Sequence, residues 1–172
     1  MKEKAIYLID GNSLLYRSFY AIQRLTNSQG FPTNAVYGFI NTLRKLIEQE
    51  KPQYLGIVFD VKGPTVRHKV FKDYKAHRKP MPQDLEVQVP VLKKVIKALR
   101  IPCFEYEEYE ADDVLGSLAR LAAAKNMGTV IVSTDKDLLQ LVDSTTRIYN
   151  PAKEIHLDEK GVESYFGARP SQ

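Results

Sequence analysis

The chain has 172 residues, of which 44% are hydrophobic, and this is enough for one domain with a buried core. It holds no run of about 18 apolar residues, so the sequence predicts no membrane span, and the charge at Asp10 comes too soon for a secretory signal. Cys103 is the only cysteine, which excludes an internal disulfide. We expect its thiol to be buried and the protein to be cytosolic and monomeric.

The net charge is +4, but acidic residues are concentrated at 105–113, where six of nine residues are carboxylates. Carboxylates this close raise one another's pKa and oppose folding unless a cation screens them. The run precedes an apolar helix pattern, whose N-terminus would help to keep Glu110, Asp112 and Asp113 ionised. We therefore predict a cation-binding region, with a solvated acidic turn as the alternative. An excess of base around such a region indicates a polyanionic partner.

In chain order, apolar segments typical of strands alternate with segments that repeat at helical spacing. We predict strands at 4–9, 54–59, 101–106 and 129–133, with short strand-like pieces at 147–149 and 154–156. We predict helices at 13–22, 35–50, 84–100, 111–126, 138–142 and 158–166, and we expect Pro90 to delay the regular start of the third. This alternation indicates an α/β fold with a mostly parallel central sheet that helices cover on both faces.

Residues 61–82 interrupt this pattern because they have no apolar periodicity. Basic side chains neutralise phosphates and aromatic rings stack on unpaired bases, so we predict an excursion that binds nucleic acid, with a solvated basic face as the alternative. Lys75 and Arg78 lie beside Tyr74, and one of them is a candidate for steering a scissile phosphate. The basic residues of the excursion are Lys62, Arg67, Lys69, Lys72, Lys75, Arg78 and Lys79.

Carboxylates also follow each of the four main predicted strands at the point where the strand ends. Parallel strands bring their carboxyl ends to one edge of a sheet, where ligands bind. Any one such residue also suits a helix cap or a turn, but four strand ends together favour a shared divalent-metal site. Asp10 and Asp60 end the first two strands, Glu110, Asp112 and Asp113 follow the third, and Asp135 and Asp137 follow the fourth.

Two divalent ions about 4 Å apart suit hydrolysis of a phosphodiester bond without a covalent intermediate. The sequence has no motif for a competing chemistry, such as GxSxG, GxxxxGK[ST], GxGxxG, HExxH or CxxC. We expect Gly11, Asn12 and Ser13 to cap a helix beside the metals, with a direct substrate contact as the alternative. Arg17 is a weaker candidate for a phosphate contact, and a salt bridge to a carboxylate of the cluster is equally consistent with its position.

Several segments together resemble the 5′-nuclease domain at the N-terminus of bacterial DNA polymerase I, a member of the flap-endonuclease superfamily with a PIN-like fold. They are LIDGNSLLYRSFYA, AVYGF, VFD with a later R-H-x-x-x-x-x-Y-K-x-x-R, YEADD and STDKDLLQL, in this order over essentially all of residues 1–172. The resemblance implies a structure-specific, divalent-metal-dependent 5′ nuclease of replication and repair in the bacterial cytosol and nucleoid. The implied partners are DNA with a 5′ flap or a single-stranded 5′ end and RNA primer–DNA junctions, and the implied cofactors are Mg²⁺ or Mn²⁺.

By position, the resemblance implies that Asp10, Asp60, Glu110 and Asp112 hold a first metal, and that Asp135 and Asp137 hold a second, with Asp113 a ligand or a neighbour. Residues 61–82 match the arch or clamp through which the 5′ single strand passes. Within it, Tyr74, Lys75 and Arg78 match residues that contact the strand and its phosphate. The full set of predicted DNA contacts is Arg17, Arg67, Lys69, Lys72, Tyr74, Lys75, Arg78 and Lys79.

The family continues with a GDxxDN segment, which holds two further aspartates, and with a helix-hairpin-helix element that grips duplex DNA. This chain stops before both, so we expect a truncated nuclease domain, either a piece of a longer polypeptide or a shortened relative, with an incomplete second metal site. Polymerase domains are the implied neighbours in the parent chain. Two other functions stay open at this point: a PIN-type ribonuclease, and a nucleic-acid-binding module without cleavage.

Overall fold

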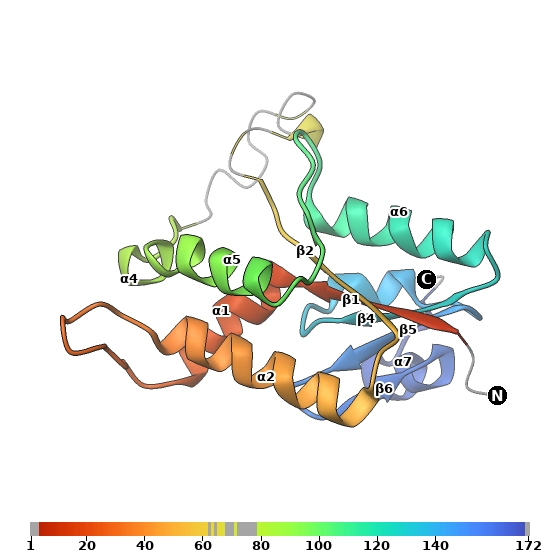
Figure 1. Cartoon of the computed structure of the whole chain (residues 1–172). Coiled ribbons are helices and arrows are strands. Elements are labelled where there is room, and N and C mark those ends of the chain that lie inside the picture. Colours follow the sequence, from red (N-terminus) through yellow and green to blue (C-terminus); the bar gives the residue numbers. More distant parts are fainter. Residues whose placement is uncertain (1–3, 62, 64, 68–70, 72–78, 171–172) are drawn as a thin grey trace.

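The computed structural model describes residues 4–61, 63, 65–67, 71 and 79–170 of the chain. A six-stranded sheet in the order β3-β2-β1-β4-β5-β6 forms its centre (Figure 1). Neighbouring strands are parallel except β5 and β6, which are antiparallel. The strands are β1 (Ala5–Asp10), β2 (Tyr54–Val58), β3 (Cys103–Phe104), β4 (Gly128–Val132), β5 (Thr146–Asn150) and β6 (Ile155–Leu157).

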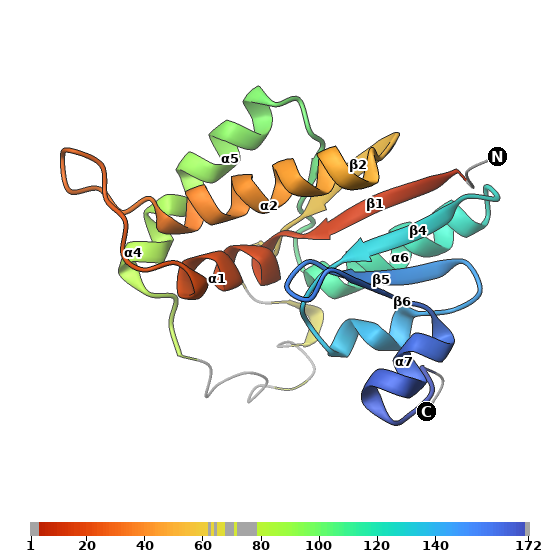
Figure 2. The same cartoon turned by 90° about the horizontal axis from the view of Figure 1, so that it is seen from below.

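Helices cover both faces of this sheet (Figure 2). One layer contains α1 (Gly11–Ala21), α2 (Asn34–Glu50), α4 (Gln83–Glu86) and α5 (Gln88–Ala98). The other contains α6 (Ala111–Ala123), the 3₁₀ helix η1 (Asp137–Leu141) and α7 (Glu159–Phe166). The predicted α/β fold with a mostly parallel sheet is therefore confirmed. In the described part of the chain, no helix has both the length and the apolarity needed to cross a membrane.

The central strands are apolar on both faces, as expected for a parallel sheet between two helical layers. Ile9 and Ile57 point into the core beneath α1, α2 and α5, whereas Leu8 and Val58 point into the core beneath α6, η1 and α7. All four of these side chains are fully buried. Because each of these residues is held on its own face, the register of the strands is strongly specified.

That register brings the ends of the three central strands to one edge. Asp10 at the end of β1 lies opposite Val58 at the end of β2, and Ile9 lies opposite Val132 at the end of β4. The residues that directly follow β2 and β4 therefore emerge beside Asp10.

Element boundaries differ from the predicted ones where side chains end an element. Helix α1 begins at Gly11 rather than Ser13, because Asp10 accepts a hydrogen bond from the Ser13 backbone N at 3.0 Å and is itself the cap. The prediction that Gly11, Asn12 and Ser13 cap this helix was therefore wrong. The helix predicted at 84–100 is divided at Val87 into α4 and α5. Pro90 lies in the first turn of α5, where backbone N–H groups have no acceptor within the helix, so the N–H that proline lacks costs no hydrogen bond.

The third predicted strand is much shorter than expected. Strand β3 contains only Cys103 and Phe104, because it pairs with β2 alone and follows Pro102, which has no N–H to donate. The thiol of Cys103 is exposed rather than buried, since β3 lies at the edge of the sheet. The prediction of a buried Cys103 was therefore wrong.

The side chain of Gln88 on α5 caps the start of α2 from across the helix interface. Gln88 is fully buried, and its Oε1 accepts hydrogen bonds from the backbone N of Ala35 at 2.8 Å and of Val36 at 3.2 Å. Its Nε2 donates to Asn34 Oδ1 at 3.1 Å and to the Asp84 carbonyl at 2.7 Å. One amide of α5 thus satisfies polar groups of α2 and α4.

Replacing Gln88 by leucine is expected to lower the free energy of unfolding by about 2–4 kcal/mol, because two helix N–H groups would lose their buried acceptor. Urea denaturation followed by circular dichroism measures the change. The matched control is Gln49→Leu on the exposed side of α2, which is expected to change stability by less than about 0.5 kcal/mol. A loss below about 1 kcal/mol for Gln88→Leu would contradict the capping role.

Candidate metal centre

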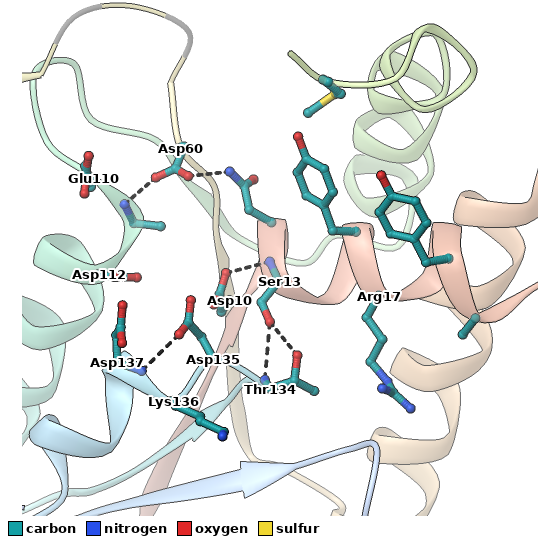
Figure 3. Close-up of a pocket in the computed structure, with 16 residues that line it drawn as sticks. Asp10, Ser13, Arg17, Asp60, Glu110, Asp112, Thr134, Asp135, Lys136 and Asp137 are labelled. Carbon is teal, nitrogen blue, oxygen red and sulfur yellow. Dashed lines mark hydrogen bonds between the residues drawn. The ribbon is translucent and has the colours of Figure 1, made fainter. Parts of the chain in front are cut away.

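A pocket of about 900 Å³ lies at the carboxyl ends of β1, β2 and β4, where α1 and α6 begin (Figure 3). Figure 3 shows Asp10 near the middle, with Asp60 and Glu110 towards the top of the view and Asp135 and Asp137 below. The predicted convergence of strand-end carboxylates is therefore observed, while their role as metal ligands stays a prediction. Six of the seven predicted carboxylates line the pocket: Asp10, Asp60, Glu110, Asp112, Asp135 and Asp137.

Asp10, the last residue of β1, is the most buried carboxylate of the pocket, with 4% of its surface exposed. Its Oδ1 accepts from the Ser13 backbone N at 3.0 Å, and its Oδ2 accepts from the Ser133 hydroxyl at 2.8 Å. Burial raises the pKa of Asp10 to about 6, and the charges of Asp135 and Asp60 add to the rise, while the two hydrogen bonds oppose it. A cation in the pocket would relieve this buried charge.

Asp60 is held between the starts of α1 and α6. Its Oδ1 accepts from the Ala111 backbone N at 2.6 Å, and its Oδ2 accepts from Asn12 Nδ2 at 2.5 Å. This arrangement needs α1 to approach β2 closely, since a Cβ at Gly11 would lie 2.5 Å from the ring of Phe59. Glycine at this position therefore lets Asp10 and Asp60 face the same pocket.

Glu110 and Asp113 stand at the start of α6, and both bind Arg67. The Nη1 of Arg67 donates to Glu110 Oε2 at 2.5 Å, and its Nη2 donates to Asp113 Oδ1 at 2.6 Å. Asp113 Oδ2 also accepts from the Glu110 backbone N at 3.2 Å, which closes the first turn of the helix. Asp113 is not among the residues that line the pocket, so the structure places it as a neighbour of the carboxylate cluster.

Asp135 and Asp137 reach the pocket because the chain turns sharply after β4. The Asp135 backbone N donates to the Ser133 hydroxyl oxygen at 3.0 Å, and the Asp137 backbone N donates to Asp135 Oδ1 at 2.9 Å. The Ser133 hydroxyl thus links the backbone of Asp135 to the carboxylate of Asp10. Asp112 lines the same pocket from the first turn of α6.

The oxygen ligands of this pocket fit a hard divalent cation by their chemistry. Across the described residues, however, no three His, Cys, Asp or Glu side chains lie close enough together to hold a metal ion as they stand. Asp10, Asp60 and Glu110 are instead each hydrogen-bonded to protein donors. To hold an ion, these carboxylates would have to move closer together than they now lie.

The predicted nucleic-acid contacts are only partly within the described chain. Arg17 is exposed and lines the pocket, and Figure 3 shows it on the opposite side from Glu110 and Asp112. Lys79 is exposed, and Arg67 binds the two carboxylates at the start of α6. Lys69, Lys72, Tyr74, Lys75 and Arg78 lie outside the described residues.

Besides Ala21 and Ala111, five further residues of the pocket wall were not predicted from the sequence. The two tyrosines among them follow Asn12 at intervals of four residues, so the helical period of α1 could have indicated them. The hydroxyl of Thr134 lies 2.8 Å from that of Ser13, which joins the end of β4 to the start of α1. The five residues are Tyr16, Tyr20, Met81, Thr134 and Lys136.

Comparison with known proteins defines the family. The sequence model of one protein family, the 5′-3′ exonuclease N-terminal resolvase-like domain, matches residues 5–167 of this chain. The chain is 44% identical over 169 residues to the 5′-3′ exonuclease of Aquifex aeolicus, covering 98% of this chain and 58% of that protein. It is 45% identical over 170 residues to the DNA polymerase I of Pseudomonas aeruginosa, covering 99% of this chain and 19% of that protein. The chain therefore belongs to the 5′-3′ exonuclease N-terminal domain family, and it spans only part of the length of these two relatives.

Solved structures show the same fold. The T5 5′-exonuclease with bound zinc has a TM-score of 0.74 and 17% identity, over 95% of this chain and 61% of that one. The bacteriophage T5 D15 flap endonuclease, in a pseudo-enzyme-product complex with DNA and metal ions, has a TM-score of 0.72 and 19% identity. This match covers 95% of this chain and 61% of that one. The predicted PIN-like fold of the flap nucleases is confirmed by this likeness. Both of these neighbours were solved with metal ions.

Proposed function

We propose that this chain is a divalent-metal-dependent 5′ nuclease that hydrolyses phosphodiester bonds in DNA with a 5′ flap or a single-stranded 5′ end, and at RNA primer–DNA junctions. The observation that carries the proposal is the pocket in which carboxylates from the ends of β1, β2 and β4 and from the start of α6 meet. Membership of the 5′-3′ exonuclease family supports the activity. The complex of the T5 flap endonuclease with DNA and metal ions supports the class of partner and cofactor.

Carboxylates from opposite ends of the pocket are suited to two cations, and their oxygen atoms favour Mg²⁺ or Mn²⁺ over softer metals. When bound, such ions activate a water molecule and stabilise the leaving oxygen of an in-line displacement. We assign Asp10, Asp60, Glu110 and Asp112 to the first ion, and Asp135 and Asp137 to the second.

The cationic side chains of the chain would bind the nucleic acid. Arg17 offers a guanidinium at the pocket wall, where it can neutralise a phosphate. Met81 lines the pocket, and Arg67 binds Glu110 of the pocket wall, so described residues from both ends of the 61–82 segment lie at the pocket. This placement supports the proposal that Lys75 and Arg78, which the segment carries between those ends, contact phosphates of the single strand.

The wider setting is part of the same proposal. Relatives named DNA polymerase I carry this region as about a fifth of much longer chains. We therefore extend the proposal to a nuclease domain, with 61–82 as its arch, that works beside polymerase domains in the bacterial cytosol.

The test uses the 172-residue chain with a labelled 5′-flap duplex and a labelled single-stranded RNA. We expect release of flap fragments in Mn²⁺ or Mg²⁺, none in EDTA, and intact RNA. Cleavage of the RNA in place of the flap would assign the chain to the PIN-type ribonucleases instead.

A second candidate, a nucleic-acid-binding module without cleavage, is favoured by the lack of a preassembled three-residue ligand set in the described part of the chain. It predicts flap binding with a steep salt dependence and no cleavage at any metal concentration. The same experiment, with binding measured over a series of salt concentrations, separates the two candidates.

A further inference from the structure

Arg67 ties the first part of the 61–82 segment to the acidic start of α6. Its guanidinium binds Glu110 at 2.5 Å and Asp113 at 2.6 Å, one carboxylate for each terminal nitrogen. The backbone N of the preceding Val66 donates to the Glu108 carbonyl at 2.8 Å. Two consecutive residues are thus fixed to the same acidic run, which defines where the guanidinium stands.

Glu110 is shared between Arg67 and the pocket. It is 8% exposed and lines both the main pocket and an adjoining pocket of about 470 Å³. Arg67 lines the adjoining pocket but not the main one. Burial of a carboxylate is less costly when its charge is paired, and Arg67 supplies a paired positive charge to Glu110. While this ion pair is formed, Oε2 of Glu110 accepts a hydrogen bond from Arg67.

We propose that Arg67 is a positioning residue that competes with the divalent ion for the carboxylate of Glu110, an inference that rests on the proposed metal site. The guanidinium and the ion would both draw on the charge of the same Glu110 carboxylate and would repel each other, so loading the ion weakens the Arg67–Glu110 pair. Asp113 lies outside the pocket and caps α6, so it retains Arg67 nearby while Glu110 turns to the ion. The arginine therefore sets how much metal is needed to fill the site.

The competition is tested by titrating Mn²⁺ into metal-stripped protein and measuring Kd by isothermal calorimetry. Arg67→Ala is expected to bind Mn²⁺ about threefold to tenfold more tightly than the wild type, because the ion no longer displaces an ion pair. Arg67→Lys keeps the charge but can meet only one carboxylate at a time, so its Kd is expected to lie between the two. The matched control is Arg24→Ala, which removes an arginine from the exposed pair with Asp84 and is expected to leave Kd unchanged.

A double-mutant cycle separates competition for Glu110 from a general effect of charge. In a Glu110→Gln background, Arg67→Ala is expected to change the Kd for Mn²⁺ less than about twofold. The neutral amide has no negative charge for which Arg67 and the ion could compete. Arg67 variants that bind Mn²⁺ no more tightly than the wild type would overturn the proposal. If Arg67→Ala tightens Mn²⁺ binding equally in the Glu110→Gln background, the proposal is overturned as well. Arg67 would then act by general charge repulsion and not through Glu110.

The same titration tests the metal site independently of Arg67. Asp135→Asn is expected to weaken Mn²⁺ binding. If the wild type binds no Mn²⁺, or if Asp135→Asn binds it equally well, the proposed metal site fails. If the wild type binds and Asp135→Asn does not, while Arg67→Ala matches the wild type, only the competition fails.

Discussion

Asp135→Asn is expected to lower the rate of 5′-flap cleavage in Mn²⁺ by about 100-fold or more. Mutating a residue that only hydrogen-bonds to a metal ligand already lowers activity about 10–100-fold, and Asp135 is assigned as a ligand itself. The substitution removes a negative charge from the pocket but keeps the oxygen that accepts from the Asp137 backbone N at 2.9 Å. The turn into η1 should therefore persist, and the loss would be one of chemistry and not of folding. Single-turnover cleavage of a labelled flap duplex measures the effect.

Binding of the same flap in EDTA is expected to stay within about twofold of the wild type, because the phosphate contacts belong to cationic side chains. Asp158→Asn is the matched control. Asp158 accepts from the Gly161 backbone N at 2.8 Å at the start of α7, outside the pocket, and asparagine caps a helix equally well. Its cleavage rate should equal that of the wild type. Full activity in Asp135→Asn would remove Asp135 from the metal site.

Asp10→Asn is expected to raise the free energy of unfolding of the metal-free protein at pH 8 by about 1–3 kcal/mol. The pKa of Asp10 is raised from 3.8 to about 6 in the folded protein, chiefly by burial, so its ionised form opposes folding. Asparagine is neutral and of the same shape. Its oxygen can accept from the Ser13 backbone N, and its amide can donate to the Ser133 hydroxyl oxygen, which reverses the direction of that hydrogen bond. The variant therefore keeps the contacts and removes the charge.

The sign of the pH dependence follows from the raised pKa. Below pH 3.8 the wild-type carboxyl is protonated in both the folded and the unfolded state, so the two proteins should be equally stable. As the pH rises through about 6, the folded wild type loses stability relative to Asp10→Asn, and the difference is complete at pH 8. Chemical denaturation at pH 3.5, 6 and 8 in EDTA measures it. A less stable Asp10→Asn at pH 8 would contradict the cost assigned to the buried charge.

Divalent metal should reverse the order of the two proteins. An ion that binds only the folded state stabilises it by mass action, and the wild type offers the ionised Asp10 as a ligand whereas the variant does not. At pH 8 the melting temperature of the wild type is expected to rise with added Mg²⁺ or Mn²⁺, and that of Asp10→Asn to rise much less. Equal shifts would mean that Asp10 is not a ligand.

The sequence by itself determined the class of fold and the place of the site. Segments such as 54–58 are apolar at every position, which suits a strand buried on both faces and not a strand with one wet face. Parallel strands all end at one edge of the sheet, so aspartates placed directly after them emerge at the same edge. That is why the order of residues alone predicts one site for seven carboxylates, of which six line the pocket in the structure.

Only the tertiary structure decided which way each side chain of the site turns. Asp113 caps α6 and stands outside the pocket, although it follows Asp112 directly, because consecutive helical residues point in different directions. Tyr16 faces the pocket because α1 begins at Gly11 and is pressed close to Phe59, a contact between separate elements. The partner of Glu110 is Arg67, 43 positions away, and no local pattern selects it. These choices depend on the rotation of each helix against the sheet and on distant partners, which the spacing of residues along the chain does not encode.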